Sequence, residues 1–165
     1  DRTFGLAFAK SQIAAGEGLP VNGTIFISLA DRDKDAGIPV AKDFIDLGFQ
    51  IAATSGTAAF LKEHLIEVDA VVAKLSDEGR EISAGIDAVE LIAAGQVRLV
   101  INTPRGSGPR VDGYRIRQAA TAHKIPCLTT VAAARAAAVG IGEWIANPLR
   151  VRSLQEYLSP KSELL

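Results

Sequence analysis

The chain has 165 residues, of which 48% are hydrophobic and 22% are charged, so it is long enough for one domain with a sizeable core. Its formal net charge is −1, which excludes the strongly basic composition of proteins that bind nucleic acid or anionic membranes by charge alone. The single cysteine, Cys127, excludes an internal disulfide and a cysteine-based metal site, and no apolar run is long enough to span a bilayer; we therefore expect a cytoplasmic protein.

The first 20 residues predict a short helix and a linker. A modest apolar stripe runs over residues 4–13, and glycines and a proline then interrupt the pattern between residues 16 and 23. The chain begins without methionine, so we interpret residues 1–20 as the end of a preceding domain in a longer protein. A processed or trimmed N-terminus is the alternative. We expect the main domain to cover residues 21–158 and a tail to cover 159–165.

Five apolar runs of strand length follow, and each is continuous rather than alternating, as in strands buried on both faces of a parallel sheet. The runs are residues 24–28, 49–53, 70–73, 99–102 and 126–129. The helical patterns are residues 36–47, 57–65, 84–94, 112–123 and 131–142. This alternation predicts right-handed crossovers and a three-layer α/β/α fold around a five-stranded, parallel, doubly wound sheet. We expect a short amphipathic piece near residues 154–158 to pack back onto the domain.

Polar residues follow every predicted strand, at the edge where open parallel sheets bind ligands. These residues are Ser28 with the run 31–34, the run 54–57, Lys74, the run 102–106, and Thr129 with Thr130. Hydroxyls, an amide, two lysines and glycines suit a phosphate, because helix N-termini offer backbone N–H groups and the favourable end of the helix dipole. The predicted donors and charges are Thr54, Ser55, Thr57, Lys34 and Lys74, and Gly56 would permit close approach.

Each of these features also has a simpler interpretation. Thr54 or Ser55 could be an ordinary N-cap, and Lys34 and Lys74 could be solvated surface charges. The glycines at 106 and 108 lack the context of a dinucleotide-binding fingerprint, and no phosphate-transfer motif is present. The two histidines and Cys127 are best explained as structural residues. The prediction of a site therefore rests on all five strand ends being polar together.

Evidence for catalysis is weaker. The sequence shows no apparent arrangement of nucleophile, histidine and acid, although such partners need not be adjacent. Asp112 could act as a base, but no obvious acid accompanies it. We therefore assign no catalytic residue and no metal ligand.

An ordered series of segments identifies a family. "ISLADRDK" (27–34), "GFQIAATSGTAAFL" (48–61), "LVINTPRG" (99–106), "DGYRIRQAA" (112–120), "IPCLTTVAAARAA" (125–137) and "VRSLQEY" (151–157) resemble the C-terminal allosteric domain of the carbamoyl phosphate synthetase large subunit. The resemblance runs from about residue 21 to residue 157. "FAKSQ" (8–12) resembles the end of the domain that precedes it.

The resemblance implies a methylglyoxal synthase-like fold and a domain without chemistry of its own. Such domains bind nucleotide monophosphates, with UMP inhibiting and IMP activating in some members, and contribute to an ornithine site. The implied partners are the rest of the large subunit and a small glutaminase subunit. The implied whole enzyme is an ATP-dependent ligase of pyrimidine and arginine biosynthesis, which uses ATP and Mg (or Mn) in other domains, so no cofactor is expected in this chain.

The motifs also carry residue roles. Phosphate-binding positions of the family match Lys34, Thr54, Thr57 and Lys74, and further nucleotide contacts match Ser28 and Asn102. We add their neighbours Ser55, Gly56 and Thr103 to the expected effector site. An ornithine-contacting position matches Thr129.

Three departures bear on which effector binds. Pro104 replaces a threonine and offers neither a hydroxyl nor an N–H, Cys127 replaces a tyrosine, and residues 78–92 form a longer stretch than usual.

Two other functions stay open. Methylglyoxal synthase itself shares the fold, and Asp112 matches one of its aspartates, but Pro109 stands at its histidine position. The domain could also be a structural module with an empty site.

Overall fold

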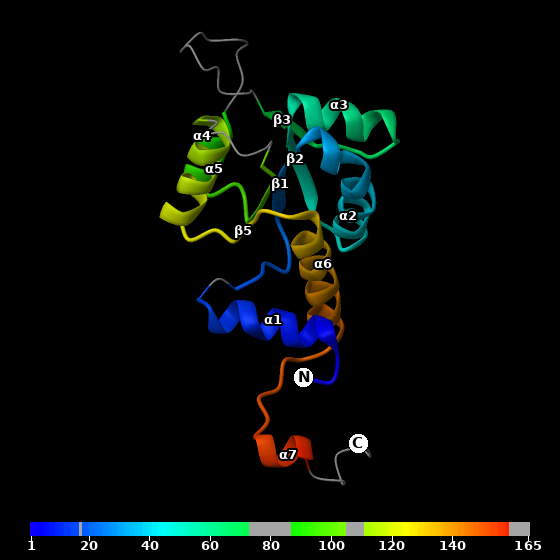
Figure 1. Ribbon diagram of the computed structural model, residues 1–165, viewed down its shortest axis with the longest axis vertical. Helices are drawn as coiled ribbons and strands as arrows, with labels where there is room; N and C mark the ends of the chain where they lie inside the picture. The colour runs from blue at the N-terminus through cyan, green and yellow to red at the C-terminus, as the bar shows by residue number, and fades with distance from the viewer. Residues whose placement is uncertain (17, 73–86, 105–110, 159–165) are drawn as a thin grey trace.

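A computed structural model describes residues 1–16, 18–72, 87–104 and 111–158, with the side chains of residues 111 and 112 excepted. Its centre is a parallel five-stranded sheet with the order β3-β2-β1-β4-β5 (Figure 1). The strands are β1 (Thr24–Ser28), β2 (Gln50–Thr54), β3 (Ala70–Val72), β4 (Leu99–Asn102) and β5 (Cys127–Leu128). The sequence prediction of five parallel strands is confirmed, with each bound shifted by at most one residue, but the edge strand β3 is not buried on both faces, since Val71 is exposed.

Successive residues of β1, β2, β4 and β5 enter two separate cores, because side chains alternate across a sheet. Ile25 and Ile27 of β1 belong to one core, whereas Phe26 belongs to the other. The first core lies under α2 (Lys34–Asp46), α3 (Ser55–Glu63) and α6 (Val131–Ala146). The second lies under α4 (Ala88–Ala93) and α5 (Val111–Ala122). Figure 1 shows these two groups of helices on opposite sides of the sheet, so the three-layer architecture is confirmed.

The strand order reverses between β1 and β4. β1 pairs with β2 on one side and β4 on the other, and Ser28 lies opposite Asn102 in the register of the last pair. In doubly wound sheets the chain diverges to opposite sides at such a point and leaves a place for a ligand at the carboxyl ends of the strands. The topology therefore brings the ends of β1, β2 and β4 together where the sequence predicted a phosphate site.

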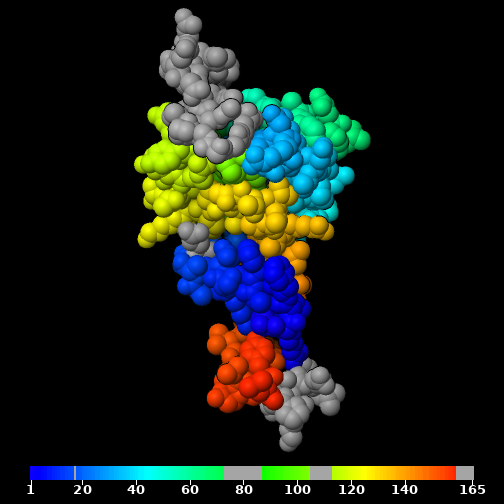
Figure 2. Space-filling view, in the orientation of Figure 1, coloured from blue at the N-terminus to red at the C-terminus, as the bar shows by residue number. Residues whose placement is uncertain are grey.

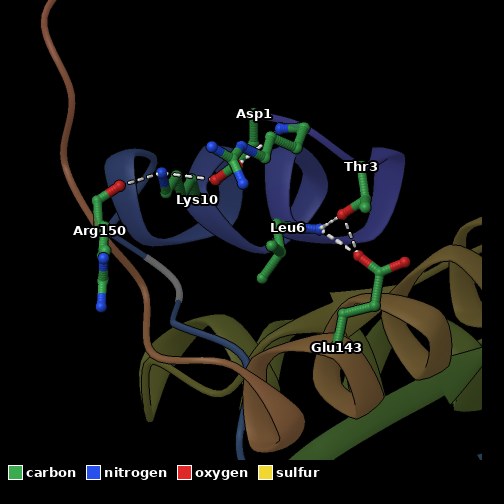
Figure 3. Close-up of polar contacts among 7 residues, drawn as sticks. Asp1, Thr3, Leu6, Lys10, Glu143 and Arg150 are labelled. Atoms are coloured by element: carbon green, nitrogen blue, oxygen red, sulfur yellow. Dashed lines mark hydrogen bonds and ion pairs between the residues drawn. The ribbon is translucent and has the colours of Figure 1, made fainter. Parts of the chain in front are cut away.

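The N-terminal helix α1 (Phe4–Ala14) packs across α6 (Figure 1). Ala9 is fully buried in the first core, and a Cβ added at Gly140 would lie only 3.0 Å from the carbonyl oxygen of Gly5, so the two backbones approach closely at this crossing. Glu143 of α6 also accepts a hydrogen bond of 2.9 Å from the Leu6 N–H and one from the Thr3 hydroxyl (Figure 3). A carboxylate in this place complements the positive end of the α1 dipole.

The last helix, α7 (Leu154–Leu158), does not pack back onto the domain as we expected. Leu154 and Leu158 are 69% and 75% exposed, and Figure 2 shows α7 beyond α1, at the end of the molecule away from the sheet. The helix is instead capped locally: the Ser153 N–H donates to the Glu156 carboxylate at 2.6 Å, and the Glu156 N–H donates to the Ser153 hydroxyl at 3.3 Å. The hydrogen bonds from the Ser153 backbone and hydroxyl hold the pKa of Glu156 below its ordinary value.

Candidate functional site

The candidate site lies at the carboxyl edge of β1, β2 and β4, which we call the rim. Helices α2 and α3 begin at the rim, so both present their N-terminal turns to it. The rim contains the following predicted site residues: Ser28, Lys34, Thr54, Ser55, Gly56, Thr57, Asn102 and Thr103. Lys74 lies outside the described residues.

Thr57 and Thr103 hold the segment that follows β1. The Thr57 side chain is completely buried, and its Oγ1 accepts a hydrogen bond of 3.0 Å from the Leu29 N–H. Thr103 is nearly as buried, and its Oγ1 accepts one of 2.7 Å from the Ala30 N–H. Both threonines therefore have a structural task that sequence reasoning did not assign, since they fix the backbone leading to Lys34.

The N-terminus of α3 has no side-chain cap from its own N-cap residue. The helix begins at Ser55 rather than Thr57, and Thr54 is the N-cap residue in extended conformation. In the structure described, the Thr54 side chain does not cap the helix; its Oγ1 instead lies 3.2 Å from the Thr57 Oγ1. Gly56 is exposed, and a Cβ there would meet no atom within 4 Å. Within the part of the chain that the structure describes, the first N–H groups of α3 thus receive no side-chain cap from Thr54, which the simple N-cap interpretation required.

Lys34 is held against the side of α3. Its ammonium lies 2.9 Å from the Asp31 carboxylate and 5.6 Å from the centroid of the Phe60 ring in α3. The Lys34 side chain is only 18% exposed, whereas that of Asp31 is 78% exposed. The lysine is therefore not a freely solvated surface charge. Asp31 occupies the kind of position that an incoming anion would take, and an exposed carboxylate can be displaced at small cost.

Replacing Asp31 with asparagine should tighten binding of inorganic phosphate roughly two- to fivefold, because an exposed ion pair of about 0.5–1 kcal/mol no longer competes for Lys34. Isothermal titration of the 165-residue chain measures the change. Asp46→Asn, at the opposite end of α2, removes the same charge away from the rim and should change the affinity little. Equal tightening in both variants would show a general charge effect instead.

Two arginines that sequence reasoning missed also reach the rim. Arg117 of α5 donates from Nη1 to the Asn102 Oδ1 at 3.1 Å, and Asn102 is only 3% exposed. Arg32 donates from Nη2 to the carbonyl oxygen of Pro104 at 2.7 Å. Pro104 has no hydroxyl, but its carbonyl oxygen accepts this hydrogen bond and so joins the segment after β4 to the segment after β1. The partners of each pair lie far apart in the sequence, so no local sequence pattern indicated these contacts.

The remaining predicted residues lie apart or outside the described part. Thr129 is exposed after β5, beside Thr130, whose hydroxyl caps α6 by accepting from the Ala133 N–H at 3.1 Å. His64 contacts the Phe60 ring and the Phe60 carbonyl oxygen, as expected for a structural histidine. Pro109 and the Asp112 side chain, which entered the comparison with methylglyoxal synthase, lie outside the described residues.

Within the described residues, no group of three or more His, Cys, Asp or Glu side chains could hold a metal ion. None of the helices in that part of the chain combines the length and apolar character needed to cross a membrane. The described groups at the rim are backbone N–H groups, hydroxyls, an amide, cationic side chains and the Asp31 carboxylate that pairs with Lys34. The donors and cations among these groups can hold an anion.

Comparison with known proteins decides the family. The profile of the MGS-like domain family matches residues 36–129, a range that runs from α2 past β5. The chain belongs to this family. The matched range contains the ends of β2 and β4 and the whole of α3.

Longer proteins contain a similar MGS-like domain. The chain is 50% identical over 159 residues to the carbamoyl phosphate synthase large chain of Mycobacterium tuberculosis (strain ATCC 25618 / H37Rv), covering 94% of this chain and 14% of that protein. It is 44% identical over 158 residues to the protein of the same name from Synechocystis sp. (strain ATCC 27184 / PCC 6803 / Kazusa), covering 96% of this chain and 14% of that protein. The carbamoyl phosphate synthase large chain of Rubrobacter xylanophilus is 44% identical over 163 residues, covering 98% of this chain and 15% of that protein. The chain thus spans about one seventh of these relatives.

Proposed function

We propose that this MGS-like domain is a regulatory domain of a carbamoyl phosphate synthase large chain and that it binds a nucleoside monophosphate at the rim. The observation that carries the proposal is the N-terminus of α3, which Thr54 leaves without a side-chain cap, together with Lys34, which lies against Phe60 of the same helix. The identity to large chains over nearly the whole domain supports the enzyme context. UMP and IMP are the effectors we expect, and this chain itself does no chemistry.

The phosphate would take the place that Asp31 holds next to Lys34. The N–H groups of Ser55 and Gly56 would donate to its oxygens, and the α3 dipole would favour its charge. The Lys34 ammonium is restrained by Asp31 and Phe60, so little side-chain entropy would be lost on binding. Ser28 and Asn102, opposite each other at the ends of β1 and β4, would then contact the sugar or the base.

Binding would regulate the enzyme only if it distinguishes two arrangements of the whole large chain. We propose that the nucleotide stabilises one packing of this domain on the catalytic part, which would use ATP and Mg (or Mn) and receive ammonia through a small glutaminase subunit. Thr129 would contact ornithine from the exposed end of β5. We place the enzyme in the cytoplasm.

Lys34→Ala together with Thr57→Ala should abolish measurable UMP binding, and Lys34→Ala alone should weaken it roughly 10- to 100-fold because a charge-assisted hydrogen bond is lost. Isothermal titration with UMP, and then with IMP, measures both. Lys62→Ala is the matched control, since Lys62 lies exposed in the last turn of α3. The single Lys34 variant is needed because Thr57 also supports the fold. Unchanged affinity in the double variant would refute the site.

A further inference from the structure

We infer that Arg117 is a positioning residue that decides which side of the Asn102 amide faces a ligand at the rim. The inference rests on the proposed function for its ligand, but its geometric basis is independent of it. Sequence reasoning assigned Asn102 to the site and gave Arg117 no role.

The two side chains meet although they lie on different elements. Asn102 ends β4, and Arg117 lies in the second turn of α5. Side chains of a helix lean toward its N-terminus, so the Arg117 guanidinium reaches back to the first turn of α5 and contacts the Asn102 Oδ1 at 3.1 Å. Asn102 is 3% exposed and Arg117 is half-buried, so this contact is partly shielded from water and fixes the amide more firmly than a fully exposed hydrogen bond would.

The direction of this hydrogen bond is settled by chemistry. An arginine side chain carries only donors, so Asn102 must present its oxygen to Arg117 and not its nitrogen. The amide NH₂ group is then the one that does not contact Arg117, and the neighbouring strand end carries Ser28, the register partner of Asn102. Without Arg117, rotation of the amide by 180° would exchange two groups of nearly equal size and could present an acceptor instead.

Arg117 therefore makes Asn102 a hydrogen-bond donor to the ligand. A donor at this place selects a ligand that offers an acceptor there, such as a carbonyl oxygen of a nucleobase, and disfavours one that offers an N–H. A free phosphate held at the α3 N-terminus would not depend on it. Arg117 would thus set base selectivity, while Lys34 and α3 set phosphate affinity.

Gly113 leaves the space that the hydrogen bond between Arg117 and Asn102 requires. A Cβ added at Gly113 would lie 3.0 Å from the Arg117 Nη1 and 3.5 Å from the Asn102 Oδ1. A larger residue at this position would crowd the hydrogen bond without removing either partner or any charge. Gly113→Val is therefore a second, independent way to disturb the pair.

The test is a double-mutant cycle in the 165-residue chain, read by titration with UMP and with inorganic phosphate. Arg117→Met should weaken UMP binding roughly tenfold, the loss of about one well-oriented hydrogen bond, and leave phosphate binding within about twofold. The same substitution in an Asn102→Ala background should have no further effect on UMP, because Arg117 acts through Asn102. Arg115→Met, which removes one exposed charge from the same helix, should match the parent chain for both ligands. Additive losses of Arg117→Met and Asn102→Ala, or equal effects of the two arginine variants, would overturn the inference.

A ligand-free measurement separates this inference from the proposed function. The side-chain NH₂ resonances of Asn102 in ¹⁵N-labelled chain should form one set in the parent protein and in Arg115→Met. They should broaden or split in Arg117→Met and Gly113→Val, because the amide then samples both orientations. Unchanged resonances in Arg117→Met would overturn the positioning role whatever the ligand. Failure of the parent chain to bind UMP, with the resonances responding as expected, would overturn the proposed function and the selectivity but leave Arg117 as the residue that orients Asn102.

Discussion

Replacing Thr57 with valine should lower the free energy of unfolding by about 1–3 kcal/mol, although the two side chains have nearly the same shape. The reason is the Leu29 N–H, which is buried with its residue and donates to the Thr57 Oγ1 at 3.0 Å. Valine removes the acceptor and leaves this donor unsatisfied in a completely buried place, where water cannot replace the hydroxyl. Urea denaturation of the 165-residue chain measures the loss as a lower midpoint at unchanged slope.

Thr57→Ser is the matched control, because it keeps the acceptor oxygen and removes only a methyl group. Its loss should be about 1 kcal/mol or less. A valine variant no less stable than the serine variant would show that the Leu29 N–H finds another acceptor. Thr57→Val should also bind UMP more weakly than Thr57→Ser, since the segment that Leu29 begins carries Lys34.

Gly140→Val should loosen the crossing of α1 over α6 and cost about 1–3 kcal/mol. A Cβ at this position already lies 3.0 Å from the carbonyl oxygen of Gly5 and 3.6 Å from the Ala9 Cβ, and the γ carbons of valine need further space. The obstacle is backbone on another helix, so α1 must move as a body. Hydrogen exchange at the Leu6 N–H, which donates to Glu143 in the native packing, should become faster, and the midpoint of urea denaturation should fall.

Gly142→Val is the control on the same helix. There the nearest atom to an added Cβ is the Leu47 Cδ2 at 3.3 Å, the far end of a flexible and only partly buried side chain that can move aside. Both variants change the intrinsic helix propensity of α6 by the same amount, so their difference isolates the contact with α1. Similar exchange rates at Leu6 in the two variants would contradict the close packing of α1 on α6.

The sequence predicted the sheet because its strands are continuous apolar runs separated by helical patterns, which is the composition of a sheet covered on both faces. It also predicted that polar strand ends would meet, and β1, β2 and β4 do bring Ser28, Thr54 and Asn102 to one edge. Those conclusions need only periodicity and topology. Which hydroxyl is open to a ligand and which supports the backbone depends on the path of the chain after each strand.

Contacts between side chains far apart in the sequence could not be predicted for the same reason. Arg117 and Asn102 are 15 residues apart, and Arg32 and Pro104 are 72 apart, so no local pattern joins them. The helical pattern was predicted from residue 57, whereas α3 begins at Ser55 after Thr54, one of the two residues that the sequence offered as an N-cap. The packing of α7 was predicted wrongly because its two leucines suggested an apolar face, whereas a cap within the segment is enough to close so short a turn of helix.

Helix α6 connects the end of β5 with the N-terminal helix α1. Its first turn is capped by Thr130, next to Thr129 at the exposed end of β5, and Glu143 near its last turn is bonded to the start of α1 (Figure 3). Sixteen residues of α-helix make a rod of about 24 Å. A packed helix transmits a small tilt at one end as a larger displacement at the other, with little bending between. The exposed end of β5 and the orientation of α1 are thus mechanically joined by one helix.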